Sequence, residues 1–243
     1  MTTMKTGQKA DNSAKTVGDF VAEDYRVATV FEKYGIDFCC GGQASLAAIC
    51  QEKGLDPDKV LQEIAEARNE PIQRSENYRA WTLPFLIDYI VNTHHAYLKE
   101  NDEQIAAYAR KIVEVHGAQH PEVVEIATIF NKIASDMVAH LQEEEEVFFP
   151  AVKRVAAATS AEKSPDEKDR ALIKSSLDKL HLEHEEIGDA IHRIRHLAED
   201  YTIPKDVCNT FVVTYRKLKE FEDDLHKHVH LENNILFLKA AQL

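Results

Sequence analysis

Glycine and proline are scarce in this chain of 243 residues, which contains eight glycines and seven prolines. So few turn-forming residues favour long helices over many short strands. No stretch approaches the roughly 20 apolar residues of a membrane span, and the first 20 residues lack the apolar run of a signal peptide. The four cysteines, two of them adjacent, do not resemble the disulfide framework of a secreted protein. We therefore expect a cytoplasmic protein with no membrane partner.

Positive charge is also in short supply. The chain has 29 lysines and arginines against 42 aspartates and glutamates, which gives a net charge of −13. Such a balance argues against binding to nucleic acid or to anionic membrane surfaces. What the chain does have is a hydrophobic content of 44%, enough for a sizeable core, and an unusual number of histidines, twelve in all.

The sequence divides into four expected parts. Residues 1–15 read as a disordered polar tail, 16–68 as a small helical domain, 69–79 as a polar linker and 80–241 as a helical bundle. Within the small domain, Gly35 fits the end of a helix, Gly41-Gly42 a tight turn, and Asp56-Pro57 the start of a further helix.

Four long helical patterns fill the bundle region, at about 84–115, 121–157, 165–199 and 204–240. In the third, Ser164 is the expected cap, Pro165 occupies the first helical position, and Glu167 completes a capping box. Pro204 is the expected start of the fourth helix. Four such helices joined by short loops predict an all-α fold with an up-down-up-down four-helix bundle.

Two segments of the bundle match each other, HLQEEEEVFFP at 140–150 and HVHLENNILFL at 228–238. Each places a glutamate four residues after a histidine, so that both side chains lie on one face of a helix. Each also places a phenylalanine five residues after the glutamate. The matching residues are His140, Glu144 and Phe149 in the first copy and His228, Glu232 and Phe237 in the second. The copies look like two halves of one site.

The apolar stripes indicate which histidines point inward. In the second and fourth helices the His–Glu pairs replace apolar residues of the buried stripe, and His184 does so in the third, where an unpaired charge is costly. In the first helix His94 and His95, three and four residues after Val91, could each continue the apolar stripe. The spacing does not distinguish between them. His95, His140, His184 and His228 are spaced by 45, 44 and 44 residues, which puts one histidine per helix at about one level of an antiparallel bundle.

Four imidazoles and two carboxylates can hold two metal ions, with both glutamates bridging. This donor set suits iron, manganese or zinc. A single His–Glu pair arises often by chance in a histidine-rich acidic chain, but two matched pairs with two further histidines in phase favour a metal site. The remaining acidic and histidine residues are expected to be solvated: Glu143, Glu145 and Glu146, and His116, His120, His192 and His196, while His181, His226 and His230 fall off the stripe.

The adjacent cysteines Cys39 and Cys40 cannot form an ordinary disulfide with each other. Their glycine neighbours suggest an exposed turn at a helix N-terminus, where a thiolate is stabilised, which fits a redox, metal-transfer or gas-reactive role. A pair of small buried residues is an equally good interpretation. Cys50 and Cys208 are expected to be ordinary core thiols.

The sequence as a whole resembles the RIC family (repair of iron centres), di-iron proteins for iron–sulfur cluster repair that contain a hemerythrin-like domain. The segments that carry the resemblance are 37–42 (DFCCGG), 90–95 (IVNTHH), 183–186 (EHEE) and the two matched copies, with Leu238 where the family often has proline. The resemblance implies two iron ions in a non-haem site that is carboxylate-bridged and oxo-bridged. It implies six ligands: His95, His140, His184 and His228 as terminal ligands, and Glu144 and Glu232 as bridges.

The resemblance also implies a function, the repair of iron–sulfur clusters damaged by nitric oxide or oxidative stress. The labile di-iron site would supply iron, and Cys39-Cys40 would guide the transfer of iron or electrons. One alternative is a nitric oxide reductase acting at the same centre. Another is a hemerythrin-type dioxygen carrier or sensor, which is weaker because hemerythrins use a fifth histidine. The expected partners are damaged iron–sulfur proteins, with nitric oxide or oxygen species as small ligands and a homodimer as the family's assembly.

Overall fold

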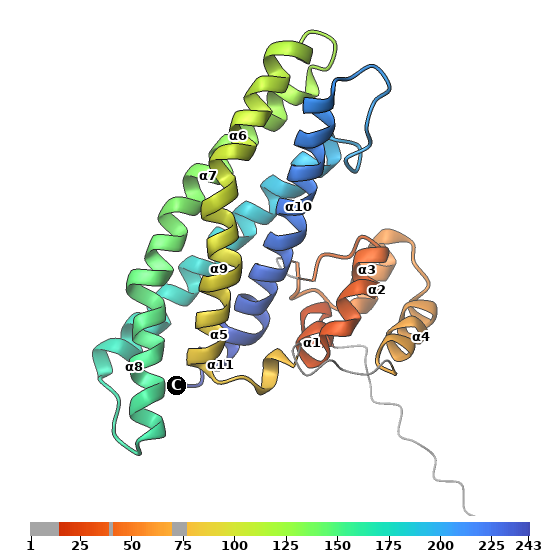
Figure 1. The fold of residues 1–243 in the computed structure, drawn as a ribbon. Coiled ribbons are helices and arrows are strands. Elements are labelled where there is room, and N and C mark those ends of the chain that lie inside the picture. Colours follow the sequence, from red (N-terminus) through yellow and green to blue (C-terminus); the bar gives the residue numbers. More distant parts are fainter. Residues whose placement is uncertain (1–14, 39–40, 70–76) are drawn as a thin grey trace, which may run out of the picture. The chain divides into compact units, whose positions relative to one another are not determined.

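The computed structural model describes residues 15–38, 41–69 and 77–243 of the chain (Figure 1). These ranges contain helices, turns and one isolated bridge between Thr16 and Ser45, with no strand, so the all-α prediction is confirmed. The backbone forms two compact units, residues 1–79 and 80–243. The tail expected at 1–15 lies outside the described residues except for Lys15, and so does the linker expected at 69–79 except for 69 and 77–79.

The first unit consists of short helices with side-chain caps. They are α1 (Val17–Glu23), α2 (Ala28–Lys33), α3 (Leu46–Lys53) and α4 (Pro57–Ala67), with a 3-10 turn at Tyr25–Val27. Thr16 caps α1 through a capping box, Ser45 caps α3, and Asp56 caps α4 directly before Pro57. Gly35, after α2, has a φ of +60°, a left-handed conformation that favours glycine. The three phenylalanines Phe20, Phe31 and Phe38 pack together beneath these helices.

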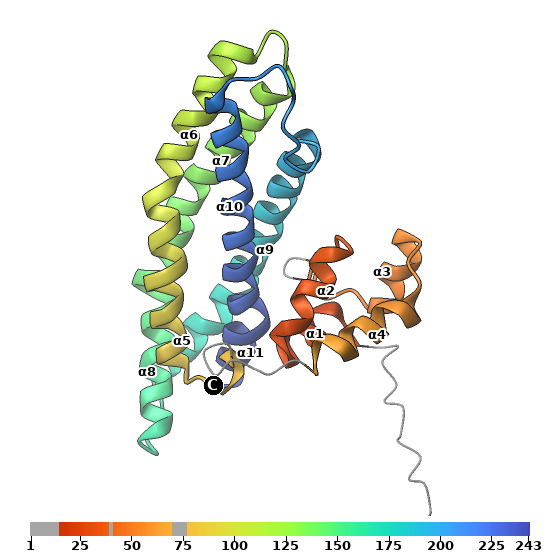
Figure 2. The same ribbon diagram turned by 45° about the vertical axis from the view of Figure 1, so that its right-hand side comes forward.

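The second unit consists of four long helical rods that lie side by side and alternate in direction (Figures 1 and 2). The first rod runs through α5 (Leu83–Ile90), a π-helical turn (Val91–His95) and α6 (Ala96–His116). The second runs through α7 (Glu122–Glu143), a π-helical turn (Glu144–Phe148) and α8 (Phe149–Ser160). The third is the single helix α9 (Glu167–Leu197), and the fourth comprises α10 (Asn209–Leu231), a π-helical turn (Glu232–Leu236) and α11 (Phe237–Ala240).

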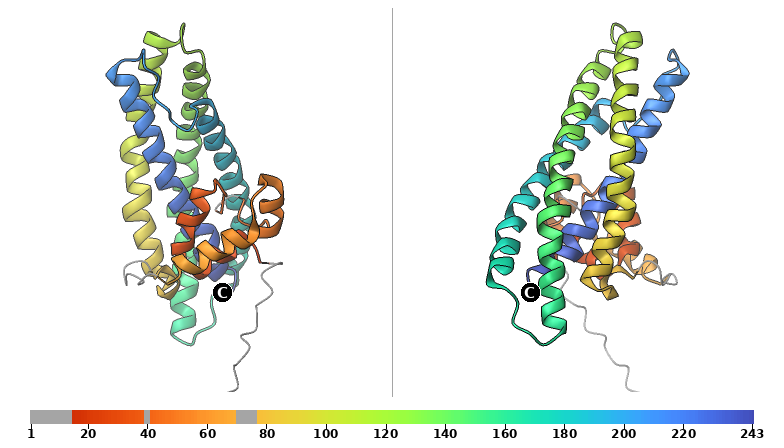
Figure 3. Two further views of the ribbon diagram at one scale, coloured as in Figure 1. Left: turned by 90° about the vertical axis from the view of Figure 1, so that its right-hand side faces the viewer. Right: turned by 60° about the vertical axis from the view of Figure 1, so that its left-hand side comes forward.

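The packing of the rods follows their order in the chain. α6 packs on α7 and on α10, and α7 packs on α9, which closes the four rods around one apolar interior. Two further views show the same arrangement, with α9 as the uninterrupted rod (Figure 3). In the described part of the chain, no helix combines the length and the apolarity needed to cross a bilayer.

Two of the expected helix starts were wrong. The third helix begins at Glu167 and is capped by Asp166, whose side chain accepts a hydrogen bond from the Lys168 backbone, instead of by Ser164. Asp and Ser are equally good caps, so the sequence signal is ambiguous there. The fourth helix begins at Asn209 instead of Pro204, because the fixed φ of proline suits a turn as well as a first helical turn.

The three π-helical turns were not expected from the sequence. A π turn inserts a residue into the helical repeat, so it changes which side chains face inward after it. In the second rod Val147 follows Glu144 by three residues, a spacing that predicts an inward position in the buried stripe. It is instead 39% exposed, while Phe148 and Phe149 are buried in its place. Each π turn contains one of the histidines or glutamates singled out by the sequence, namely His95, Glu144 or Glu232.

Candidate metal centre

Six side chains from the four rods meet in one layer of the second unit. His95 ends the π turn of the first rod, His140 lies in α7 and Glu144 follows it at the start of the next π turn. His184 lies in α9, His228 in α10, and Glu232 at the start of the last π turn. All six are buried, with exposed fractions between 0% and 3%: His95, His140, Glu144, His184, His228 and Glu232.

The six residues form two groups that share both carboxylates. One group is His95, Glu144, His228 and Glu232, and the other is His140, Glu144, His184 and Glu232. Within each group one possible ligand atom per residue lies within 4.8 Å of all the others. Two imidazoles and two shared carboxylates per group are the arrangement that two metal ions with bridging glutamates require.

The closest approaches involve the Nε2 atoms. In the first group, Nε2 of His95 lies 3.1 Å from Nε2 of His228, 3.4 Å from Glu144 and 3.6 Å from Glu232. Nε2 of His228 lies 3.0 Å from Glu232.

The second group repeats this spacing. Nε2 of His184 lies 3.1 Å from Nε2 of His140 and 3.3 Å from Glu232, and Nε2 of His140 lies 3.4 Å from Glu144. Both groups therefore direct imidazole nitrogens and carboxylate oxygens into one small volume.

Three of the imidazoles are oriented by a hydrogen bond from their other nitrogen. Nδ1 of His95 donates to Glu145 over 2.7 Å, and Nδ1 of His140 donates to Glu183 over 2.8 Å. Nδ1 of His184 donates to the side-chain oxygen of Asn233 over 2.8 Å. A neutral imidazole that donates from Nδ1 carries its free lone pair on Nε2, which is the usual state of a metal-bound histidine. The outer partners thus prepare Nε2 to bind a cation.

The two glutamates indicate the same need for a cation. Glu144 and Glu232 are fully buried, and none of their four carboxylate oxygens has a hydrogen-bond partner among the described residues. A buried carboxylate without partners is costly unless it is paired with positive charge. In the chain alone, burial lowers the pKa of His95, but Glu144 and Glu232 outweigh burial and raise that pKa to about 10. The carboxylates therefore draw positive charge to this place, and the residues present fit a pair of bound metal ions.

Aromatic rings cover two of the imidazoles. Phe149 stacks on His95 with ring centroids 5.6 Å apart, and Phe237 stacks on His184 at the same separation. Phe148 meets Phe237 edge to face at 5.4 Å. The phenylalanines of the two matched sequence copies thus lie on opposite halves of the cluster, where they pack against the imidazoles and keep water away.

Several histidine and acidic residues behave differently from the sequence-based expectation. Glu145 is not simply solvated, because it accepts hydrogen bonds from His95 and from Lys99. His230, expected off the stripe, is fully buried. His94 is also buried, but its Nδ1 donates to Asp224, away from the cluster, which leaves His95 as the histidine of the first rod that faces the glutamates.

Of the four cysteines, only two lie in the described part of the chain, and one of these two differs from the expectation. Cys39 and Cys40 lie outside the described residues. Cys50 is buried, as expected, but Cys208 is exposed and caps α10, so the expectation of a core thiol was wrong. That expectation assumed a helix from Pro204, whereas α10 begins at Asn209, so Cys208 lies at the exposed start of the helix.

Comparison with known proteins supports a metal-binding assignment. Residues 86–240, more than half of the chain, match the family described as the hemerythrin HHE cation binding domain. Residues 13–68 match ScdA_N, a domain of unknown function.

Relatives with known names align over nearly the whole chain. The iron-sulfur cluster repair protein ScdA of Staphylococcus haemolyticus is 31% identical over 225 residues, which cover 93% of this chain and 97% of that protein. ScdA of Staphylococcus epidermidis is 30% identical over 226 residues, covering 93% and 97%. The iron-sulfur cluster repair protein YtfE of Escherichia coli O81 is 29% identical over 225 residues, covering 92% and 95%. The chain therefore belongs to the family of iron–sulfur cluster repair proteins that carry a hemerythrin HHE cation-binding domain.

Proposed function

We propose that this chain holds two iron ions in the cluster of six residues and uses them to restore damaged iron–sulfur clusters. The observation that carries the proposal is that two histidine pairs share the same two buried glutamates, Glu144 and Glu232. Two unpartnered carboxylates are costly in an apolar interior unless positive charge lies beside them, and two bound metal ions would supply that charge.

The ligands divide between the ions by their grouping. His95 and His228 would hold one ion, His140 and His184 the other, and both glutamates would be shared. When bound, the iron ions supply a redox-active Lewis-acid pair with coordination positions left free, because four protein donors do not complete the six positions iron commonly uses. The di-iron identity of the centre and its oxo bridge are part of this proposal.

The surrounding residues prepare the site in two ways. Glu145, Glu183 and Asn233 fix the proton of their histidines on Nδ1, which keeps each Nε2 available. Phe149 and Phe237 exclude water from the outer faces of His95 and His184, and so strengthen the attraction between the glutamates and any bound cation.

The proposed activity is the supply of iron to a damaged cluster. The relatives are named iron-sulfur cluster repair proteins, and they align with both the small N-terminal domain and the bundle. The partners in this proposal are iron–sulfur proteins damaged by nitric oxide or oxidative stress. The cytoplasmic location, the homodimer and the role of Cys39 and Cys40 stay predictions from the sequence.

The experiment measures both metal content and iron donation. The purified chain is loaded with ferrous iron under anaerobic conditions, its iron is counted, and it is then mixed with a [4Fe–4S] protein previously damaged by nitric oxide. We expect about two iron ions per chain and recovery of the acceptor's cluster absorption as iron leaves the chain.

A Glu144→Gln variant, treated with ferrous iron in the same way, is the control and should restore nothing. Recovery of the acceptor by free ferrous iron at the same concentration sets the background that the loaded chain must exceed. If the chain retains its iron while the acceptor stays damaged, the proposal that the chain supplies iron is wrong. If it retains its iron and instead converts added nitric oxide to nitrous oxide, the reductase is the better description.

A further inference from the structure

A second histidine–carboxylate cluster lies in the same unit, outside the six residues of the metal centre. It consists of His192 on α9 and of Glu222 and His226 on α10. One nitrogen or oxygen from each residue lies within 4.8 Å of the others. Glu222 is fully buried and the two histidines are half-buried. The sequence predicts His192 to be a surface histidine and His226 to lie off the apolar stripe, and neither has a role in the proposed function.

The cluster repeats the construction of the metal centre. Glu222 and His226 are four residues apart on one helix, with Nε2 of His226 3.8 Å from Oε1 of Glu222. His192 approaches from the neighbouring helix, and its ring centroid is 5.9 Å from that of His226. A carboxylate and an imidazole one turn apart, joined by an imidazole from a facing helix, is the same combination that His184 forms with His140 and Glu144.

Glu222 is held firmly by two neighbours. Nε of Arg195 donates to its Oε1 over 2.7 Å, and the Tyr201 hydroxyl donates to its Oε2 over 2.6 Å. Tyr201 reaches this position from a turn in which three successive residues are left-handed, with φ values of 49° for Glu199, 54° for Asp200 and 59° for Tyr201. Such backbone is unfavourable for residues other than glycine and persists only where contacts impose it. The carboxylate is therefore fixed in place beside the two imidazoles.

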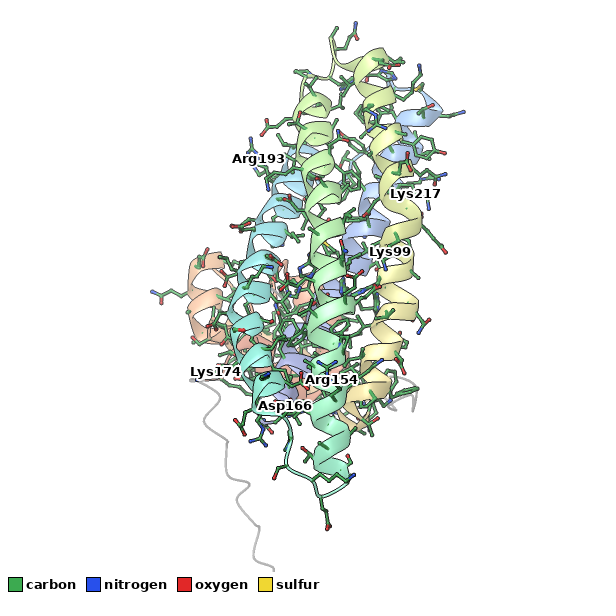
Figure 4. The ribbon with its side chains drawn as sticks, turned by 90° about the vertical axis from the view of Figure 1, so that its left-hand side faces the viewer. Lys99, Arg154, Asp166, Lys174, Arg193 and Lys217 are labelled. Carbon is green, nitrogen blue, oxygen red and sulfur yellow. The ribbon has the colours of Figure 1, made fainter. Side chains whose placement is uncertain are left out.

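The cluster is separate from the metal centre along the length of α9. Arg193, next to His192, lies on the outer surface of α9 (Figure 4) and pairs with Glu125 of α7, whereas the ring of His192 lies against that of His226 on α10. His192 follows His184 by eight residues, which is about 12 Å along a helix. A cation here would be held apart from the pair of ions in the centre.

We propose that His192, Glu222 and His226 form a mononuclear site for a divalent first-row transition metal. Two imidazoles and one carboxylate with open positions suit iron(II), cobalt(II) or zinc(II) and do not suit calcium or magnesium. We expect this site to bind a cation with lower affinity than the metal centre does. It offers only three donors, and the positively charged guanidinium of Arg195 is hydrogen-bonded to its carboxylate, Glu222. The proposal does not depend on the activity of the chain.

The test uses cobalt(II) as the probe on the full chain with its centre already filled with iron. Excess iron is removed, cobalt(II) is titrated in under anaerobic conditions, and bound cobalt is counted by equilibrium dialysis and followed by its visible d–d absorption. We expect one further cation per chain in the wild type. We expect the double variant His192→Ala/His226→Ala to lose this cobalt, with affinity reduced by more than about tenfold.

The matched control is His196→Ala, which removes an exposed histidine one turn further along α9 and should bind cobalt as the wild type does. Iron content and melting temperature are measured for all three proteins, so that failure to fold or to fill the centre is distinguished from loss of the second site. The proposal is overturned if the iron-filled wild type binds no cobalt, or if the double variant binds as much cobalt as the wild type with the same absorption.

Discussion

The Nε2 atoms of His140 and His184 lie 3.1 Å apart, yet neither can donate a hydrogen bond to the other while both rings are neutral. Each ring already places its proton on Nδ1, where His140 donates to Glu183 and His184 donates to Asn233. Two lone pairs therefore face each other in a buried layer, which is unfavourable unless a proton or a metal ion lies between them. Four imidazoles arranged in two such pairs around shared carboxylates require bound cations.

The first prediction concerns the shared carboxylates. We expect Glu144→Gln to lose most of the bound metal, because the amide removes a negative charge that both histidine groups use. The matched control is Glu146→Gln, which changes the same charge two residues away on the exposed side of the rod. Iron is counted after loading and desalting both variants. Equal iron in the two would contradict the assignment of Glu144 as a shared ligand.

The second prediction concerns the outer hydrogen bond to His95. Glu145→Gln leaves all six metal-binding side chains in place but weakens the acceptor that holds the proton of His95 on Nδ1. We expect a 10- to 100-fold loss of metal affinity, about the usual effect of such outer partners, with an unchanged number of ions at saturation.

A close control exists for this variant. Glu143 is a neighbouring glutamate that also pairs with a lysine, Lys179, as Glu145 pairs with Lys99. Among the described residues, no histidine of the cluster donates a hydrogen bond to Glu143. Affinity is measured by competition with a chelator of known strength. The same affinity in Glu143→Gln and Glu145→Gln would show that the bond to His95 has no effect on the metal.

The sequence was sufficient to predict the rods and the inward-facing histidines. Apolar residues spaced by three and four mark the buried face, and the ionisable residues within that face, such as His184 between Leu180 and Ile187, are costly there without a partner. This argument predicts the six residues that the structure brings together. The spacing did not show whether His94 or His95 faces inward in the first helix, because this depends on the π turn at Val91–His95.

The π turns and the outer partners could not be predicted in the same way. A π turn is set by the packing of distant segments and leaves no local pattern of its own, so the expected inward position of Val147 was wrong by one residue. The bond between Glu145 and His95 joins positions 50 residues apart in sequence. In a run of four glutamates, periodicity identifies the buried one, Glu144, but it does not show which exposed neighbour reaches across to another rod.

The third prediction concerns Cys208, the exposed thiol at the start of α10. Its Sγ lies 3.1 Å from Nε2 of His116. The hydrogen bond with His116, together with backbone hydrogen bonds from Phe211 and Thr210, lowers the pKa of the thiol to about 7. We therefore expect alkylation of Cys208 by iodoacetamide to reach half its maximal rate near that pH, as followed by mass spectrometry of its peptide.

The comparison for this thiol is His116→Phe, which keeps a ring against Phe211 but removes the nitrogen. Alkylation of Cys208 in this variant should need a more alkaline pH. The prediction is wrong if the two pH profiles coincide. Buried Cys50 serves as an internal reference, because burial raises the pKa of its thiol and its labelling should stay slow in both proteins.

The fourth prediction concerns Asp102, a carboxyl group buried in α6 two turns beyond His95. One of its oxygens, Oδ1, has no hydrogen-bond partner among the described residues, and burial raises the pKa of the carboxyl from 3.8 to about 7. Between these two values the folded chain binds more protons than the unfolded chain. The free energy of unfolding therefore falls as the pH rises through this window. Above pH 7 the folded chain bears the full cost of burying an ionised carboxylate. The difference between the two pKa values corresponds to roughly 4 kcal/mol.

Replacing Asp102 by asparagine removes this titration, because the amide stays neutral at every pH. We expect Asp102→Asn to be more stable than the wild type by up to about 1.6 kcal/mol at pH 5, and by up to about 4 kcal/mol at pH 8. The free energy of unfolding is measured by urea titration of iron-loaded protein, so that the metal contribution is common to both proteins. Glu103→Gln, an exposed neighbour with the same change in charge, is the control. If the variants at 102 and 103 respond to pH in parallel, Asp102 does not carry a buried proton in this range.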